Sequence, residues 1–327
     1  MSKFKFLQFR WLITFGVTLL VLWFFLQELS WREIGRTITT VNSSWLLVAA
    51  LAYVISTLIR AQRLRYVGFA DEPFIVLAKI TFLQFFYSNL LPWRTGELAF
   101  FYLVKKNTSQ PLVVAASSLL VTRLFDFIAV VILLIISLVT QFPGFVRSGN
   151  PLVLAALGVM ILLLIILVMT LFGRGLIVRI AKIFVKLIRI RESFLNAHVF
   201  PRWSRFEAEL DAVKHRVVAL LVSSLIAWVL IGLMTWGMVE SLNITVSIPR
   251  AVFLTIFPPF AALIPLPTLA NFGTIEAGWA FGLSFIGYPV SEAFQIGLSL
   301  HVLSLLLYGV GAIIGLIIRP IDQPKLT

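Results

Sequence analysis

Long apolar runs, separated by short polar and basic clusters, cover most of this 327-residue chain. Six of the runs approach the ~20 residues that a helix needs to cross a bilayer; they lie at residues 6–26, 44–59, 113–140, 151–172, 217–241 and 293–318. Each is predicted to be helical, because lipid offers no hydrogen-bond partners to an exposed backbone. The composition, 60% hydrophobic and 13% charged residues, excludes a soluble globule. The pattern therefore predicts an all-α integral membrane protein.

Two further apolar segments, 74–104 and 251–290, are broken by proline turns that lead into a glycine and a glutamate. The first break contains Asn89, Pro92, Arg94, Gly96 and Glu97, and the second contains Pro267, Gly273 and Glu276. A carboxylate at bilayer depth costs about 2.5–3.5 kcal/mol on insertion scales, which favours a functional site. We predict two re-entrant broken helices; the alternative is that proline and glycine merely kink two ordinary hairpins.

The order of these features repeats along the chain. In both halves a turn, a glycine and a glutamate precede a proline restart and a long helix, which contains Arg123 in the first half and His301 in the second. We interpret residues 44–140 and 217–318 as an internal repeat within one membrane domain spanning residues 1–327.

The basic residues predict the orientation. With the N-terminus inside the cell, 21 of the 27 Lys and Arg face the cytoplasm and four face outward, as the positive-inside rule requires. Both termini are then cytoplasmic in the inner (plasma) membrane, and the broken segments enter from opposite faces, as in transporters with inverted repeats. The net charge of +13 reflects this topology, so no nucleic-acid partner is expected. A basic amphipathic loop, 173–216, is expected to lie on the anionic inner leaflet, either as a tether or to gather anionic headgroups.

Two charged pairs have helical spacing. Arg94 and Glu97 are three residues apart, as are Arg123 and Asp126, so each pair can share a helix face and neutralise itself in lipid. Arg94 and Glu97 follow a proline break, where helix N-termini face a cavity in transporters, and are assigned to substrate binding. For Arg123 and Asp126 a binding role and a buried pair that fastens two helices are both open.

Other ionisable residues are weighed in the same way. His301 lies among leucines, where it is either a core histidine or a proton-linked gate. Arg60 and Arg63 end a predicted span and are interpreted as anchors that reach toward the interface. The chain has no cysteine and three scattered histidines, and it lacks a phosphate-binding nucleotide loop. We expect neither a metal nor another cofactor.

Asn89, Pro92, Arg94, Gly96 and Glu97, followed by Arg123, Asp126, Gly273 and Glu276, resemble the transmembrane, flippase-like domain of the lysylphosphatidylglycerol synthetase family. The resemblance extends from about residue 10 to residue 320. It departs from the family at Leu269–Phe272, where small residues are usual. The family's bifunctional bacterial members add a soluble aminoacyl transferase, and their membrane domain is thought to move the charged lipid to the outer leaflet. This chain would be a stand-alone member.

The resemblance and the residues together imply a transporter that moves a phospholipid or lipid-linked headgroup between leaflets. The substrate-binding residues would be Arg94, Glu97, Arg123, Asp126, Glu276 and His301, with the arginines on phosphate and the glutamates on an amine. Membrane lipids, and a lipid-modifying synthase or transferase, are the expected partners. The alternative is a membrane-embedded transferase, or an accessory subunit of one, acting on a polyprenyl phosphate or lipid; the chain shows no clustered acidic pair for the divalent ion that such chemistry usually needs.

Overall fold

A computed structural model describes residues 41–91, 95–144, 214–262 and 268–318, together with the isolated positions 16, 158, 161, 162, 165 and 264. Apart from such positions, the predicted spans 6–26 and 151–172 lie outside the described residues. So does nearly all of the basic loop 173–216. Three of the singled-out motif residues, Pro92, Arg94 and Pro267, are also outside them.

The four described stretches are helical and contain no strand. Within the described stretches, four helices are long and apolar enough to cross a membrane: α3 (Ser43–Leu64), α6 (Leu112–Gln141), α12 (Val217–Ser241), which follows the 3-10 turn η2 (Lys214–Arg216), and α16 (Val290–Ile317). They coincide within a few residues with four of the six predicted spans, and the all-α membrane fold is confirmed.

The two segments predicted to be broken consist of short helices. The first contains α4 (Phe74–Leu90) and α5 (Gly96–Asn107). The second contains α13 (Ile248–Leu254), α14 (Phe257–Ala261), the 3-10 turn η3 (Leu269–Asn271) and α15 (Thr274–Phe285). Proline directly precedes α4, α6 and α16. Proline is tolerated at the start of a helix because a backbone N–H there would have no hydrogen-bond acceptor within the helix.

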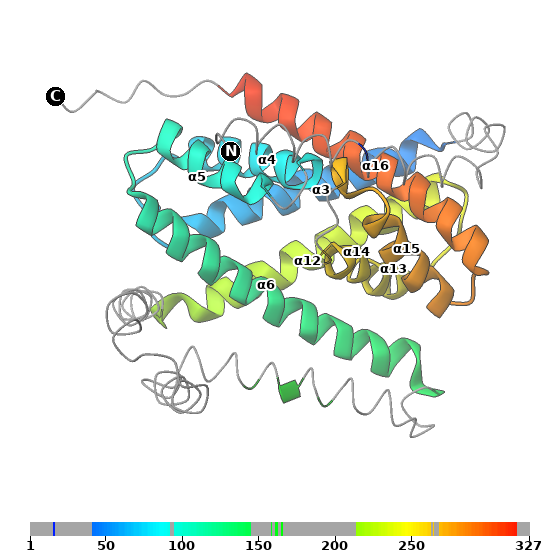
Figure 1. Cartoon of the computed structure of the whole chain (residues 1–327). Helices are drawn as coiled ribbons and strands as arrows, with labels where there is room; N and C mark the ends of the chain where they lie inside the picture. Colours follow the sequence, from blue (N-terminus) through cyan, green and yellow to red (C-terminus); the bar gives the residue numbers. More distant parts are fainter. Residues whose placement is uncertain are drawn as a thin grey trace. The chain divides into compact units, whose positions relative to one another are not determined.

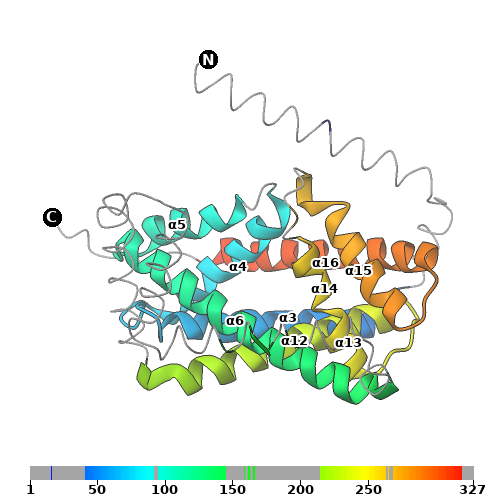
Figure 2. The ribbon, with the colours of Figure 1, turned by 60° about the horizontal axis from the view of Figure 1, so that its bottom comes forward.

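Most of these helices belong to one compact unit, made of residues 1–62, 71–112 and 226–327. In this unit α16 packs against α15 and α4, and α4 packs against α5 (Figures 1 and 2). The second broken segment contributes α13 and α14, which pack on α15, and η3, which contacts α4. The two broken segments therefore lie side by side.

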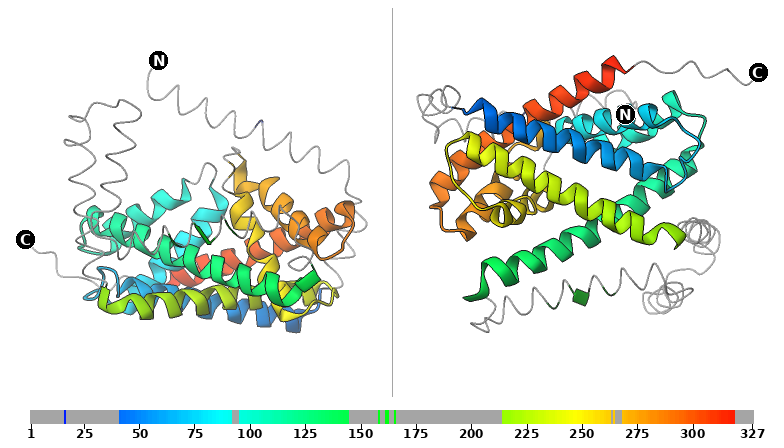
Figure 3. Two further views of the ribbon diagram at one scale, coloured as in Figure 1. Left: turned by 90° about the horizontal axis from the view of Figure 1, so that it is seen from below. Right: turned by 180° about the vertical axis from the view of Figure 1, so that it is seen from behind.

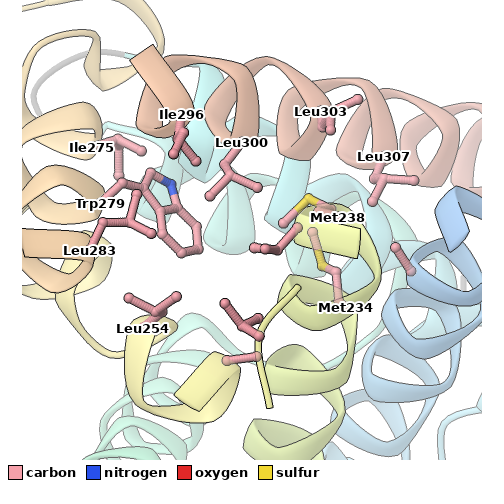
Figure 4. Close-up of a cluster of buried hydrophobic side chains, with 14 of the residues drawn as sticks. Met234, Met238, Leu254, Ile275, Trp279, Leu283, Ile296, Leu300, Leu303 and Leu307 are labelled. Atoms are coloured by element: carbon pink, nitrogen blue, oxygen red, sulfur yellow. The ribbon is translucent and has the colours of Figure 1, made fainter. Parts of the chain in front are cut away.

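The core of this first unit is apolar and tightly packed. Trp279 of α15 lies among Ile296 and Leu300 of α16 and Leu283 of its own helix (Figure 4). Small residues allow close approach between helices: a Cβ on Gly311 of α16 would lie 2.4 Å from the Tyr53 hydroxyl of α3.

The second compact unit consists of residues 63–70 and 113–225. Its longest described element is α6, which Figure 3 shows along its length. The turn after α3 contains Gly68, whose φ of 108° lies in the left-handed region that glycine tolerates. The Ser118 hydroxyl of α6 donates to the Val67 carbonyl, which fastens this turn to the helix.

Candidate functional site

The turn that opens α15 has an unusual backbone. Ala270, Asn271 and Gly273 have φ angles of 52°, 56° and 92°, and a left-handed conformation is uncommon for the first two residue types. This is the stretch that departs from the family in sequence, so alanine and asparagine adopt here a conformation that glycine adopts without cost. Such conformations concentrate at functional sites, where the surrounding structure maintains them.

Glu276 stabilises this turn from the first helical turn of α15. Its Oε2 accepts a hydrogen bond of 2.7 Å from the Gly273 backbone N–H, at the start of the helix. A carboxylate in this position also interacts favourably with the helix dipole. The Thr274 hydroxyl donates to the Asn271 carbonyl over 2.8 Å, which closes the turn from the other side.

The other oxygen of Glu276 contacts the neighbouring helix. Oε1 lies 2.7 Å from Nδ1 of His301 on α16, and the two side chains are 0% and 3% exposed. The Phe272 ring packs on the imidazole with a centroid separation of 4.9 Å. A carboxylate and an imidazole at this depth form a polar site inside an apolar unit, and such sites in membrane proteins are usually functional.

The first broken segment joins this site. The Asn271 amide lies 3.4 Å from the Asn89 carbonyl at the end of α4, and the Asn89 amide donates to Phe85 over 2.8 Å. Beyond that end, α5 starts at Gly96, where a Cβ would lie 2.2 Å from the Tyr87 carbonyl oxygen, so this position has room for glycine alone. The structure thus brings the two predicted motifs together.

Glu97 stands in the first turn of α5 and is half-buried. Its predicted partner Arg94 is outside the described residues. The assignment of this pair to substrate binding therefore stays a prediction.

Arg60 of α3 is buried in the first unit. Its guanidinium lies 5.3 Å from the Phe85 ring centroid and 5.4 Å from that of Trp228, within cation–π range. The interpretation of Arg60 and Arg63 as interfacial anchors is wrong for both, because their exposed fractions are 7% and 4%. The sequence contained a signal for this burial. Two arginines three residues apart in an apolar helix lie on one face of that helix.

The second unit contains a separate ionic cluster. Arg63 binds Asp126 with both arms of its guanidinium: Nη1 is 2.6 Å from Oδ1 and Nη2 is 3.1 Å from Oδ2. The same Nη1 lies 2.5 Å from the Ser224 hydroxyl of α12. Helical spacing predicts that Asp126 can share a face with Arg123, its neighbour on α6. The structure shows Asp126 buried against Arg63 and Arg123 on the exposed side of the helix.

Comparison with known proteins agrees with the resemblance inferred from the motifs. The model of the family described as "Lysylphosphatidylglycerol synthase TM region" matches residues 11–312. The chain is also similar to the UPF0104 membrane protein MJ1078 of Methanocaldococcus jannaschii, with 27% identity over 212 residues, which are 64% of this chain and 84% of that protein. No solved structure matches the chain. A family match over most of its length shows that this multi-pass membrane protein belongs to the lysylphosphatidylglycerol synthase TM region family.

Proposed function

We propose that this protein is a lipid flippase, which moves a phospholipid or a lipid-linked headgroup between the two leaflets. The observation that carries the proposal is the buried Glu276–His301 pair at the point where the two broken segments meet. Broken helices that meet around polar groups are the usual binding-site architecture of secondary transporters. Membership of a family named after a lipid synthase directs the proposal toward lipids.

The chemistry of the first unit suits a charged headgroup. Glu276 offers a carboxylate for an amine, and Arg60 offers a permanent cation for a phosphate. Asn271 and Asn89 add neutral hydrogen-bonding groups beside the carboxylate. The proposal assigns these residues to headgroup recognition, and it assigns no chemical catalysis to the protein. A synthase or transferase that makes the lipid would be its partner.

The proposed topology places the chain in the inner membrane with both termini in the cytoplasm and the two halves inverted. Because the chain contains no cysteine, single cysteines can report it directly. Thr108→Cys after α5 and Ser247→Cys before α13 should react with an impermeant thiol reagent from opposite sides of intact cells. Labelling of both from the same side would refute the inverted arrangement.

Function is tested by leaflet exchange in proteoliposomes. Vesicles would contain a trace of short-chain fluorescent phospholipid, with the headgroup varied among choline, ethanolamine, glycerol and aminoacylated glycerol. A membrane-impermeant quencher then reports the outer-leaflet fraction over time. We expect exchange that is faster than in protein-free vesicles and that depends on the headgroup.

The matched pair of variants is Glu276→Gln and Glu292→Gln. The first neutralises a buried carboxylate of α15, and the second makes the same change at an exposed position in the first turn of α16. We expect Glu276→Gln to reduce the rate of lipid exchange at least about tenfold, because it removes the charge that the proposal assigns to headgroup binding. Glu292→Gln should retain the wild-type rate. Absence of exchange with every headgroup, in folded wild-type protein, would overturn the proposal.

A further inference from the structure

We propose that the Glu276–His301 pair binds and releases one proton in each transport step, so that lipid translocation is driven by a proton gradient. The inference rests on the proposed function and assigns its energy source. It starts from the geometry of two buried side chains on neighbouring helices, joined at 2.7 Å.

The hydrogen bonds define which atom takes the proton. Oε2 of Glu276 is occupied by the Gly273 N–H, and Oε1 is occupied by Nδ1 of His301. Opposite an ionised carboxylate, Nδ1 must carry a hydrogen, so the lone pair of the neutral imidazole is on Nε2. Within the described part of the chain, Nε2 of His301 forms no hydrogen bond. The pair is therefore a carboxylate-oriented imidazole with one open proton-binding position.

Charge balance couples this proton to another event. An ionised Glu276 beside a neutral His301 has a net charge of −1, and protonation of Nε2 brings the pair to zero. Because a net charge is costly in a buried site, proton loss must coincide with the arrival of a cationic group or with opening of the site to water. Either event is a step that a transporter has to make, which links proton release to substrate entry or to the change of access.

The surrounding helices contain few groups that could take over this role. The titratable or charged side chains on the elements packed against α15 and α16 are Lys79 and Tyr87 of α4, Arg250 of α13, and Tyr53 and Arg60 of α3, whose Tyr53 ring lies against Tyr308. In addition, α16 itself contains Glu292 and Tyr308. Lys79 donates to the Ile318 carbonyl, and Arg250 and Glu292 are exposed. Among the described residues, Glu276 and His301 are ion-pair partners of each other alone.

The proton site is connected to the element that would have to move. Glu276 holds the Gly273 end of the turn containing the left-handed residues Ala270 and Asn271, and Asn271 contacts the first broken segment at Asn89. A change in the charge of the pair alters both hydrogen bonds of the carboxylate. The strained turn, through which the second broken segment contacts the first, is thus the bistable element that we expect protonation to bias.

The first test measures the proton site without transport. Full-length protein labelled with ¹⁵N-histidine would be titrated by NMR in lipid nanodiscs over the whole pH range in which it stays folded, because the ring nitrogens report the charge of an imidazole. We expect one titrating imidazole that is absent from His301→Asn, a variant whose amide can still donate to Glu276 but cannot bind a proton. If the His301 resonance does not titrate, the inference is overturned whatever the transport assays show.

The second test measures coupling in sealed proteoliposomes that contain a pH-sensitive dye, with the membrane potential clamped by potassium and valinomycin. For one proton per lipid, a pH difference of one unit should shift the steady-state distribution of a transported lipid by about tenfold, since one pH unit corresponds to a factor of ten. His301→Asn should abolish this shift. If wild-type protein exchanges lipid at a distribution that does not depend on the pH gradient, proton coupling is overturned and the flippase proposal is retained. If it exchanges no lipid at all, the flippase proposal itself is contradicted.

Discussion

Replacing Asp126 by alanine would leave the guanidinium of Arg63 buried without its carboxylate. The two side chains are 7% and 4% exposed, and the fork geometry of the pair provides two hydrogen bonds at 2.6 and 3.1 Å. After the substitution, Nη1 would still reach the Ser224 hydroxyl at 2.5 Å, but a neutral oxygen does not compensate a buried charge.

The magnitude follows from the burial of the pair. Breaking a buried ion pair by removing one partner costs about 3–5 kcal/mol, and an arginine cannot lower this cost by losing its proton. Removing both charges is different, because the desolvation cost of the pair disappears with it. We therefore expect Asp126→Ala to lower the free energy of unfolding by about 3–5 kcal/mol, and Arg63→Met combined with Asp126→Leu to be neutral or stabilising by about 1–4 kcal/mol.

The measurement is reversible unfolding in mixed detergent micelles, followed by tryptophan fluorescence. It compares wild type, Asp126→Ala, and the cycle of Arg63→Met, Asp126→Leu and their double variant. Arg250→Ala, which removes an exposed arginine, controls for the loss of charge alone. The cycle isolates the coupling between the two side chains. A loss below about 1 kcal/mol for Asp126→Ala, the size of an exposed ion pair, would refute the reasoning, as would a double variant no more stable than the single ones.

Three further substitutions test the packing of the first unit. Gly96→Ala would place a methyl group 2.2 Å from the Tyr87 carbonyl oxygen, so we expect a loss of about 1–3 kcal/mol in the same unfolding assay, and wild-type stability would contradict the close approach of α4 and α5. Ala270→Gly removes the strain of a left-handed alanine, which is worth about 1–2 kcal/mol, and this gain exceeds the entropic cost of glycine by up to about 1 kcal/mol. We therefore expect a higher melting temperature, and a lower melting temperature would argue against the strained turn. Tyr53→Phe removes a buried hydroxyl without a hydrogen-bond partner in the described structure, so thermal stability should stay level or rise, whereas a drop above about 1 kcal/mol would reveal a bond to that hydroxyl.

The sequence was sufficient for the membrane class and for the positions of the long helices. Apolar runs near the length of a bilayer crossing must be helical, because lipid satisfies no backbone groups, and four predicted spans appear as α3, α6, α12 and α16. The breaks in the two short-helix segments were also predictable, because proline and glycine act locally on the backbone. The motif residues further identified the family, which the comparison confirmed.

The pairing of charges was decided by tertiary structure alone. Spacing along a helix shows which residues share a face, and it predicted that Arg123 and Asp126 can do so, but it cannot identify the residues that other helices bring against that face. Arg63, 63 residues earlier in the chain, contacts Asp126, and His301 of the next helix contacts Glu276. The residues of a helix and its flanks determine its length and its ends. The electrostatic environment of its side chains is created only when distant helices meet in the low dielectric of the packed interior.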